Sequence, residues 1–290
     1  MKYKKTINFL VLMIAFLSII AASIGLFSNS GEGQFEFTSI YGEKILIYGK
    51  GLYQHETAKL GLMARGQDAV TLFICIPLLL LSLYITNKGS LKGKLLLSGV
   101  QGYFLYTYTQ FTQIAYNPLF LVYILLMTLS LYAFILIMLS FDMNELKRKF
   151  DGNFPVKTSA IYGIISALCL SILWLSDIIN ALINQVPISV LDHYSANPVY
   201  SMDLGLVVPT FLVAAFLTLK KKPIGYLIST IMIIKAITMW TALTAMNVAI
   251  SFEGETLDIS DWMMTPIFTV ISILILIKIF INIKTDGVQE

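Results

Sequence analysis

The sequence predicts an all-α membrane protein with eight transmembrane helices, and three observations lead to that fold class. The 290 residues are 57% hydrophobic and only 13% charged, with a mean hydropathy of +0.78, whereas a soluble domain has roughly 25% charged residues. The apolar residues gather in runs of about 20, the length that crosses a bilayer. Lysines and arginines are concentrated in alternate connecting segments, as they are when successive loops lie on opposite sides of a membrane.

Eight runs are long enough to span. They are Ile7–Phe27, Ala69–Thr86, Leu95–Tyr116, Leu119–Phe141, Thr158–Asn180, Val199–Leu219, Ile224–Ile250 and Trp262–Ile283. The first run carries Ala21-Ala22-Ser23, so a cleaved signal peptide is an alternative. We expect a retained helix, because its 21 residues exceed the roughly 7–15 of a signal-peptide core.

The runs divide the chain into six segments. These are a first transmembrane helix (1–27), an extracytoplasmic cap (28–68), transmembrane helices two to four (69–141), a cytoplasmic loop (142–157), transmembrane helices five to eight (158–284) and a cytoplasmic tail (285–290). In the cap, Phe35–Phe37 and Ile45–Tyr48 have strand composition and flank the turn Tyr41–Lys44, which predicts a short β-hairpin. His55–Ala64 is expected as a short interfacial helix.

Charge placement predicts the orientation. With the N-terminus inside, the inner segments hold 15 of the 20 basic residues, as the positive-inside rule requires. Four acidic residues, Glu253, Glu255, Asp258 and Asp261, gather in one outer loop. We therefore expect a cytoplasmic (plasma) membrane location with both termini in the cytoplasm.

An internal repeat is indicated at an offset of 132 residues. The matched pairs are Pro77 with Pro209, Lys88 with Lys220, Gly93 with Gly225, Leu95 with Leu227, Ser98 with Thr230, Thr109 with Thr241 and Thr112 with Thr244. Spans one to four and five to eight also cross in the same order, which suggests a parallel 4+4 repeat of the kind some transporters have. The alternative is chance alignment of two leucine-rich hairpins.

Lys235 is the main candidate for a functional residue because it lies near the middle of the seventh run. A charge at that depth costs at least ~2.5–3.5 kcal/mol, so it should face protein or water. Asp177 and Asp203 lie nearer the outer ends of their spans, on the order of 10 Å away along the membrane normal. We therefore expect Lys235 to meet phenolic oxygens, backbone carbonyls or water near Tyr106, which is at the same depth, instead of a direct ion pair.

The third run carries a polar stripe spaced 3, 4, 3, 4, which places its members on one helix face. They are Tyr103, Tyr106, Gln110, Gln113 and Asn117. This face either lines a cavity or holds helices together by hydrogen bonds. The predicted cavity residues are Lys235, Tyr103, Tyr106, Gln110, Gln113, Asp177, Asp203 and Asn247.

These features favour binding or transport of a small polar or ionic solute through an outward-opening cavity. A non-transporting subunit, scaffold or sensor is the alternative, and an intramembrane enzyme is the third. For the enzyme, Met202–Gly205 stands where an aspartyl protease would have GxGD, and the surroundings of Lys235 do not match a retinal site. No catalytic residue, cofactor or metal is predicted; His55, Glu56, Asp192 and His193 offer an outer cation site only as an alternative, because nothing in the sequence fixes their geometry.

The expected partners are the lipid bilayer, a small polar solute or ion, and a protein partner or second copy; no nucleic-acid signature is present. Three stretches, Gly49–Tyr53, Ala64–Asp68 and Tyr116–Tyr123, resemble those of bacterial multi-pass integral membrane proteins of unknown function. The resemblance implies a multi-pass membrane fold and no particular activity or site residue.

Overall fold

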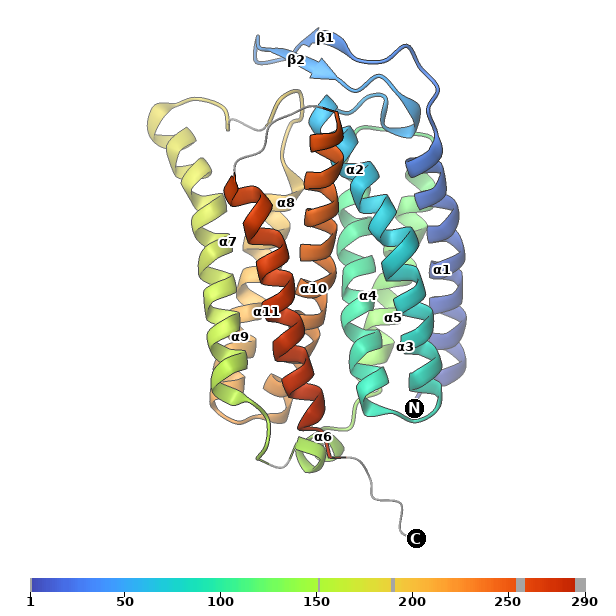
Figure 1. The fold of residues 1–290 in the computed structure, drawn as a ribbon, viewed down its shortest axis with the longest axis vertical. Coiled ribbons are helices and arrows are strands. Elements are labelled where there is room, and N and C mark those ends of the chain that lie inside the picture. The colour runs from blue at the N-terminus through green and yellow to red at the C-terminus, as the bar shows by residue number, and fades with distance from the viewer. Residues whose placement is uncertain (1, 151, 189–190, 254–258, 285–290) are drawn as a thin grey trace.

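Long helices lie side by side in the computed structural model, which describes residues 2–150, 152–188, 191–253 and 259–284 (Figure 1). Among these residues, seven helices are long and apolar enough to cross a membrane. They are α1 (Lys4–Phe27), the continuous helix Ala58–Asn87, α5 (Phe120–Leu139), α7 (Val156–Asn184), the continuous helix Pro198–Leu219, α10 (Pro223–Phe252) and α11 (Ile259–Ile281). The chain is therefore a multi-pass membrane protein. Glu255, Asp258 and the tail 285–290 lie outside the described residues.

The predicted third span is α4 (Leu91–Phe111), which begins and ends earlier than expected. It is not one of the seven apolar helices, because its tyrosines, glutamines and lysines make it more polar than its neighbours. Even so, it packs against α5 and α10, and Tyr103 and Tyr108 on it are almost fully buried. Of the polar stripe, Tyr103 and Tyr106 are buried, whereas Gln113, just after α4, is exposed.

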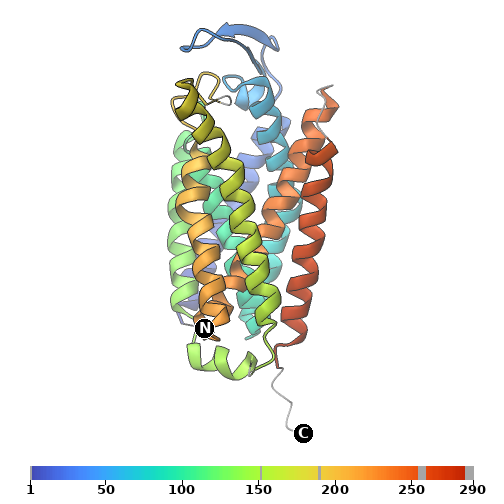
Figure 2. The ribbon, with the colours of Figure 1, turned by 90° about the vertical axis from the view of Figure 1, so that its left-hand side faces the viewer.

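The predicted hairpin is confirmed. Strands β1 (Phe35–Thr38) and β2 (Lys44–Ile47) pair antiparallel, with Phe35 opposite Ile47. The hairpin lies at one end of the bundle, and α6 (Met143–Phe150) lies at the other, where α1 begins and α11 ends (Figures 1 and 2).

The expected interfacial helix is the first part of a longer one. A short 3₁₀ turn, Gly51–Tyr53, precedes α2 (Ala58–Val70), whose first turn is capped by the Thr57 hydroxyl accepting from the Leu60 N–H. Such a side-chain cap satisfies one of the free N–H groups at a helix start. From there α2 continues without a break into the membrane-spanning part, so no loop separates the cap from the second span.

Two of the long helices contain a five-residue π-helical segment before a proline. Thr71–Cys75 lies between α2 and α3 (Ile76–Asn87), and Asp203–Val207 lies between α8 (Pro198–Met202) and α9 (Val208–Leu219). In each case a proline, Pro77 or Pro209, is the second residue of the helix that follows. Because proline lacks an N–H and crowds the preceding turn, it widens the helix there, and π-bulges of this kind are frequent at functional sites.

These elements recur at the predicted 132-residue offset. The π-helical segments begin at Thr71 and Asp203, α3 and α9 at Ile76 and Val208, and α4 and α10 at Leu91 and Pro223. The connecting turns also match: Gly89 and Lys221 both have positive φ, and Gly93 and Gly225 both press against the end of the preceding helix. In Gly225 an added Cβ would lie only 2.4 Å from the Thr218 nitrogen.

Helix α10 joins the two halves of the chain by packing against α2 and α4 as well as α9 and α11. Small residues allow this approach: a Cβ added to Gly66 would lie 2.8 Å from the Ala245 carbonyl oxygen, and one added to Gly99 would lie 2.4 Å from Ile234 Cβ. Close backbone approach at small residues is the usual way membrane helices pack. It places α10, and therefore Lys235, in the centre of the bundle.

Candidate functional site

A cavity of about 320 Å³ lies between α2, α4, α7, α9 and α10 and extends to the loop before α8. It reaches from Lys235 near the middle of α10 to Glu56 and Asn197 at the hairpin end. The predicted residues that line it are Lys235, Tyr106, Gln110, Gln113 and Asp203. Residues from both halves of the chain therefore meet around one space.

Tyr106 connects the two charged groups at the bottom of this cavity. Its hydroxyl donates to Asp203 Oδ1 at 2.8 Å, and Lys235 Nζ lies 3.8 Å from the centroid of its ring. An ammonium over an aromatic face is attracted by the ring's quadrupole, by as much as about 2 kcal/mol when water is excluded. Lys235 thus lies beside Tyr106, as expected from their equal depth in the membrane, but it contacts the face of the ring and not the phenolic oxygen.

Asp203 has two donors. Trp174 Nε1 donates to its second oxygen, Oδ2, at 2.9 Å, so each carboxylate oxygen accepts one neutral hydrogen bond. Only 6% of Asp203 is exposed, and a carboxylate at that depth needs such partners. Within the described residues no carboxylate oxygen lies within 4.0 Å of Lys235 Nζ, as the depth comparison predicted.

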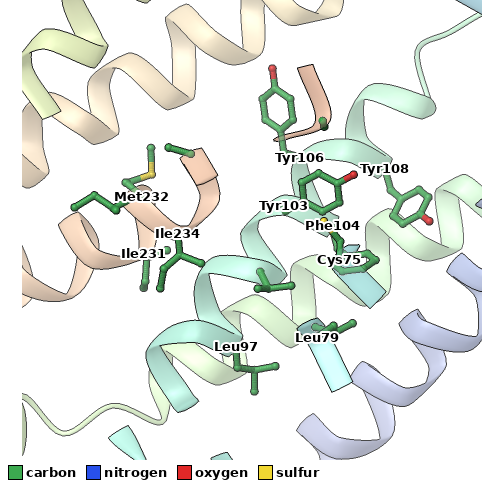
Figure 3. Close-up of a cluster of buried hydrophobic side chains, with 14 of the residues drawn as sticks. Cys75, Leu79, Leu97, Tyr103, Phe104, Tyr106, Tyr108, Ile231, Met232 and Ile234 are labelled. Carbon is green, nitrogen blue, oxygen red and sulfur yellow. The ribbon is translucent and has the colours of Figure 1, made fainter. Parts of the chain in front are cut away.

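Tyr103 does not line the cavity, although it shares a stripe with Tyr106. Tyr103 is fully buried, and its hydroxyl lies 2.7 Å from Thr71 Oγ1. Figure 3 shows Tyr103 beside Phe104 and Cys75, whereas Tyr106 points away from that cluster. The stripe therefore divides: its deeper end packs within the first half of the chain, and the next turn of α4 faces the cavity.

Asp177 and Asn247 also lie outside the cavity lining. Asp177 is half-buried and accepts from the Tyr200 hydroxyl at 3.0 Å. Tyr200 in turn packs against Trp174, with ring centroids 4.7 Å apart. Asp177 thus supports the wall that holds Trp174 against Asp203. Asn247 is half-buried on α10, one residue past the lining residue Met246.

Glu56 closes the hairpin end of the cavity. It is 2% exposed, accepts from the Ala115 backbone N–H at 2.7 Å, and also accepts from the Tyr194 hydroxyl. These contacts join the cap to the loop after α4 and to the loop before α8. Burial raises the pKa of Glu56 above its ordinary value, and the two hydrogen bonds oppose that change. Of the other residues of the alternative cation site, His193 packs edge-on against Phe37.

Two residues of this site, Trp174 and Tyr194, were not predicted from the sequence, and Glu56 was considered only for an outer cation site. Trp174 could have been found, since it lies three residues before Asp177 and therefore one turn away on the polar side of the fifth span. No signal in the sequence points to Tyr194, because its contact with Glu56 joins segments 138 residues apart.

Comparison with protein-family models, curated proteins and solved structures finds no match to this chain.

Proposed function

We propose that the protein binds a small polar or ionic solute in this outward-opening cavity, or transports it across the membrane. The observation that supports this most directly is the group formed by Lys235, Tyr106 and Asp203 at the bottom of the cavity. Charged side chains inside a membrane are costly and are retained mainly where they serve a solute path or site. Simple helix packing would not require a charged lysine facing a cavity.

The membrane arrangement that accompanies this proposal has eight spans, with α4 as the polar one. In this arrangement the membrane is the plasma membrane and both termini lie in the cytoplasm. The reason is that basic residues predominate in the segments on the same side as the termini, as the positive-inside rule requires. The cavity then opens outward, beneath the hairpin. The shared 132-residue spacing of helix starts, π-helical segments and turns supports a parallel repeat of two four-helix units.

Cysteine labelling from outside tests the cavity. In a Cys169→Ala background, which removes the exposed native cysteine, we expect Gln113→Cys and Gln110→Cys to react with a membrane-impermeant maleimide in sealed cells. Gln113 is exposed and Gln110 lies one turn deeper. Gln101→Cys is the matched control, since Gln101 is fully buried and donates to the Ser130 carbonyl. Absence of labelling at both positions would contradict an outward-opening cavity.

The subunit or sensor alternative is favoured by one feature, the hairpin. Phe35 and Phe37 on β1 are 51% and 45% exposed at the outer end of the molecule. Exposed aromatic residues on a short strand are typical of protein-binding surfaces. Crosslinking from Phe35→Cys in whole cells would detect such a partner; a purely monomeric product, together with labelling at Gln110→Cys, would leave the solute-binding proposal as the better account.

A further inference from the structure

The ammonium of Lys235 has hydrogen-bonding capacity that the protein does not use. It carries three N–H donors, and within the described part of the chain no oxygen accepts a hydrogen bond from Nζ, which lies over the Tyr106 ring. The side chain is half-buried on the cavity wall. A cation held at this depth with unused donors is complementary to an anionic hydrogen-bond acceptor.

Asp203 differs from Lys235 in this respect. Both of its oxygens already accept, from Tyr106 and Trp174, so its charge is stabilised by groups of the protein itself. Each oxygen can accept a further hydrogen bond, but the charge of Asp203 already has two donors, whereas no oxygen of the described residues accepts from the Lys235 ammonium. The larger unmet capacity at the bottom of the cavity is therefore that of the cation.

The remaining wall around Lys235 is mostly apolar. Leu170, Leu173, Val207, Phe211, Met239 and Leu243 line the space from α7, the α8–α9 helix and α10. Apolar walls with a few placed polar groups bind ligands by burying an apolar body and orienting it through one head group. An inorganic anion would leave these side chains without a partner.

We infer that the ligand is a small amphipathic carboxylic acid, whose carboxylate accepts from Lys235 Nζ and whose apolar body packs between α7, α9 and α10. This inference rests on the proposed solute-binding function and names the ligand class. Asp203 acts as a positioning residue: it accepts from the Tyr106 hydroxyl and so holds the Tyr106 ring beneath the ammonium. Gln110 and Gln113 provide a polar route from the mouth of the cavity.

Three six-carbon probes that differ in their head group test this assignment: hexanoate, hexanamide and hexylammonium. Binding is followed by tryptophan fluorescence of the detergent-purified protein, because Trp174 and Trp240 line the cavity. Trp262→Phe removes the third tryptophan, which is 39% exposed and outside the cavity. We expect hexanoate to bind about tenfold or more tightly than hexanamide, because a hydrogen bond to a charged group is the stronger one, and hexylammonium to bind weakest.

Variants at Lys235 supply the control. Lys235→Met should abolish the preference for hexanoate over hexanamide, and Lys235→Arg should retain it, with thermal unfolding showing that both are folded. In the Cys169→Ala, Gln110→Cys protein, which retains Lys235, hexanoate should also slow maleimide labelling.

The outcomes separate the two proposals. Equal binding of hexanoate and hexanamide, or tightest binding of hexylammonium, overturns the acid assignment and leaves a solute-binding cavity. No binding of any probe, with Gln110→Cys still labelled, also overturns the acid assignment. No binding and no labelling removes the proposed function itself.

Discussion

Thr71 and Tyr103 in the first half of the chain occupy the positions that Asp203 and Lys235 occupy in the second, 132 residues later. Thr71 and Asp203 each begin a π-helical segment before a proline. In the first half the pair forms a neutral hydrogen bond, 2.7 Å long, between side chains that are 0–1% exposed. In the second half the two charged residues face a cavity. Similar backbones thus support a sealed interior in one place and a candidate binding site in the other.

The corresponding region of the first half is filled by side chains, and these include a buried acid, Asp68. It accepts from the Tyr53 hydroxyl at 2.5 Å and is 2% exposed. Gly25 on α1 leaves no room beside it, since an added Cβ would lie 1.8 Å from Asp68 Oδ2. Asp203 lacks such a cover, and the space next to it is the cavity. The packing of a neighbouring helix therefore decides whether a polar group at this level is buried in the structure or accessible from the cavity.

Substitutions at the two matching positions, Tyr103 and Lys235, should give the largest difference in stability. Tyr103→Lys would bury an ammonium in a closed region and remove the hydroxyl that contacts Thr71, so we expect a loss of at least about 3 kcal/mol in the free energy of unfolding. Lys235→Met, the reciprocal change, should leave stability unchanged or raised, because it removes a charge from the membrane interior. Unfolding in mixed micelles measures both. Equal destabilisation by the two variants would mean that Lys235 is structural.

Removing the small residue at the α2–α10 contact should give the next largest effect. In Gly66→Ala the new Cβ meets the Ala245 carbonyl oxygen and Met246 Cα at 2.8 Å, and overpacking of this kind costs about 1–3 kcal/mol. Gly205→Ala is the matched control in the second half, because no atom lies within 4 Å of its added Cβ. Its change in stability should stay within about 0.5 kcal/mol. If both glycines tolerate alanine equally, α2 and α10 are not in the close contact described.

Much of the fold could be predicted from the sequence because it depends on local composition. The apolar runs gave the helices, the strand-like segments gave the hairpin, and the spacing of Pro77, Gly93 and their partners gave the repeat offset. Helix boundaries were less accurate where amphipathic turns extend a span, as at Ala58, where α2 starts well before the expected Ala69.

The site was harder to predict because its contacts join distant segments. The depth of Lys235 and Tyr106 follows from counting residues along two helices, so their proximity was predictable. The directions of Tyr103 and Tyr106 depend on how α4 is rotated against α3 and α10. The spacing of the polar stripe shows only that its residues share one helix face, not which neighbouring helix that face meets. Trp174 was not predicted because it counts as an apolar residue in its run, although its indole N–H donates a hydrogen bond to Asp203.

The mouth of the cavity should respond to pH through Glu56. Its pKa is raised by burial in the folded protein, so its neutral form favours folding. This contribution is present below the ordinary glutamate pKa of about 4.3 and is lost as the pH rises through the raised value. Thermal unfolding across that window should show falling stability in the native protein and a flat profile in Glu56→Gln. A steeper fall in Glu56→Gln than in the native protein would assign the pH dependence to another group.

The smallest effect is expected from Thr71→Val, which removes the hydroxyl partner of Tyr103 but keeps the branched shape. Loss of one buried neutral hydrogen bond costs about 0.5–1.5 kcal/mol, so unfolding in micelles should shift by that amount. Because this pair is sealed inside the first half, hexanoate binding and labelling at Gln110→Cys should not change. Asp203→Asn, at the matching position in the second half, provides the contrast: it should alter hexanoate binding while the fold persists. A change in ligand binding in Thr71→Val would mean that the two halves are coupled through α4, the helix that carries both Tyr103 and Tyr106.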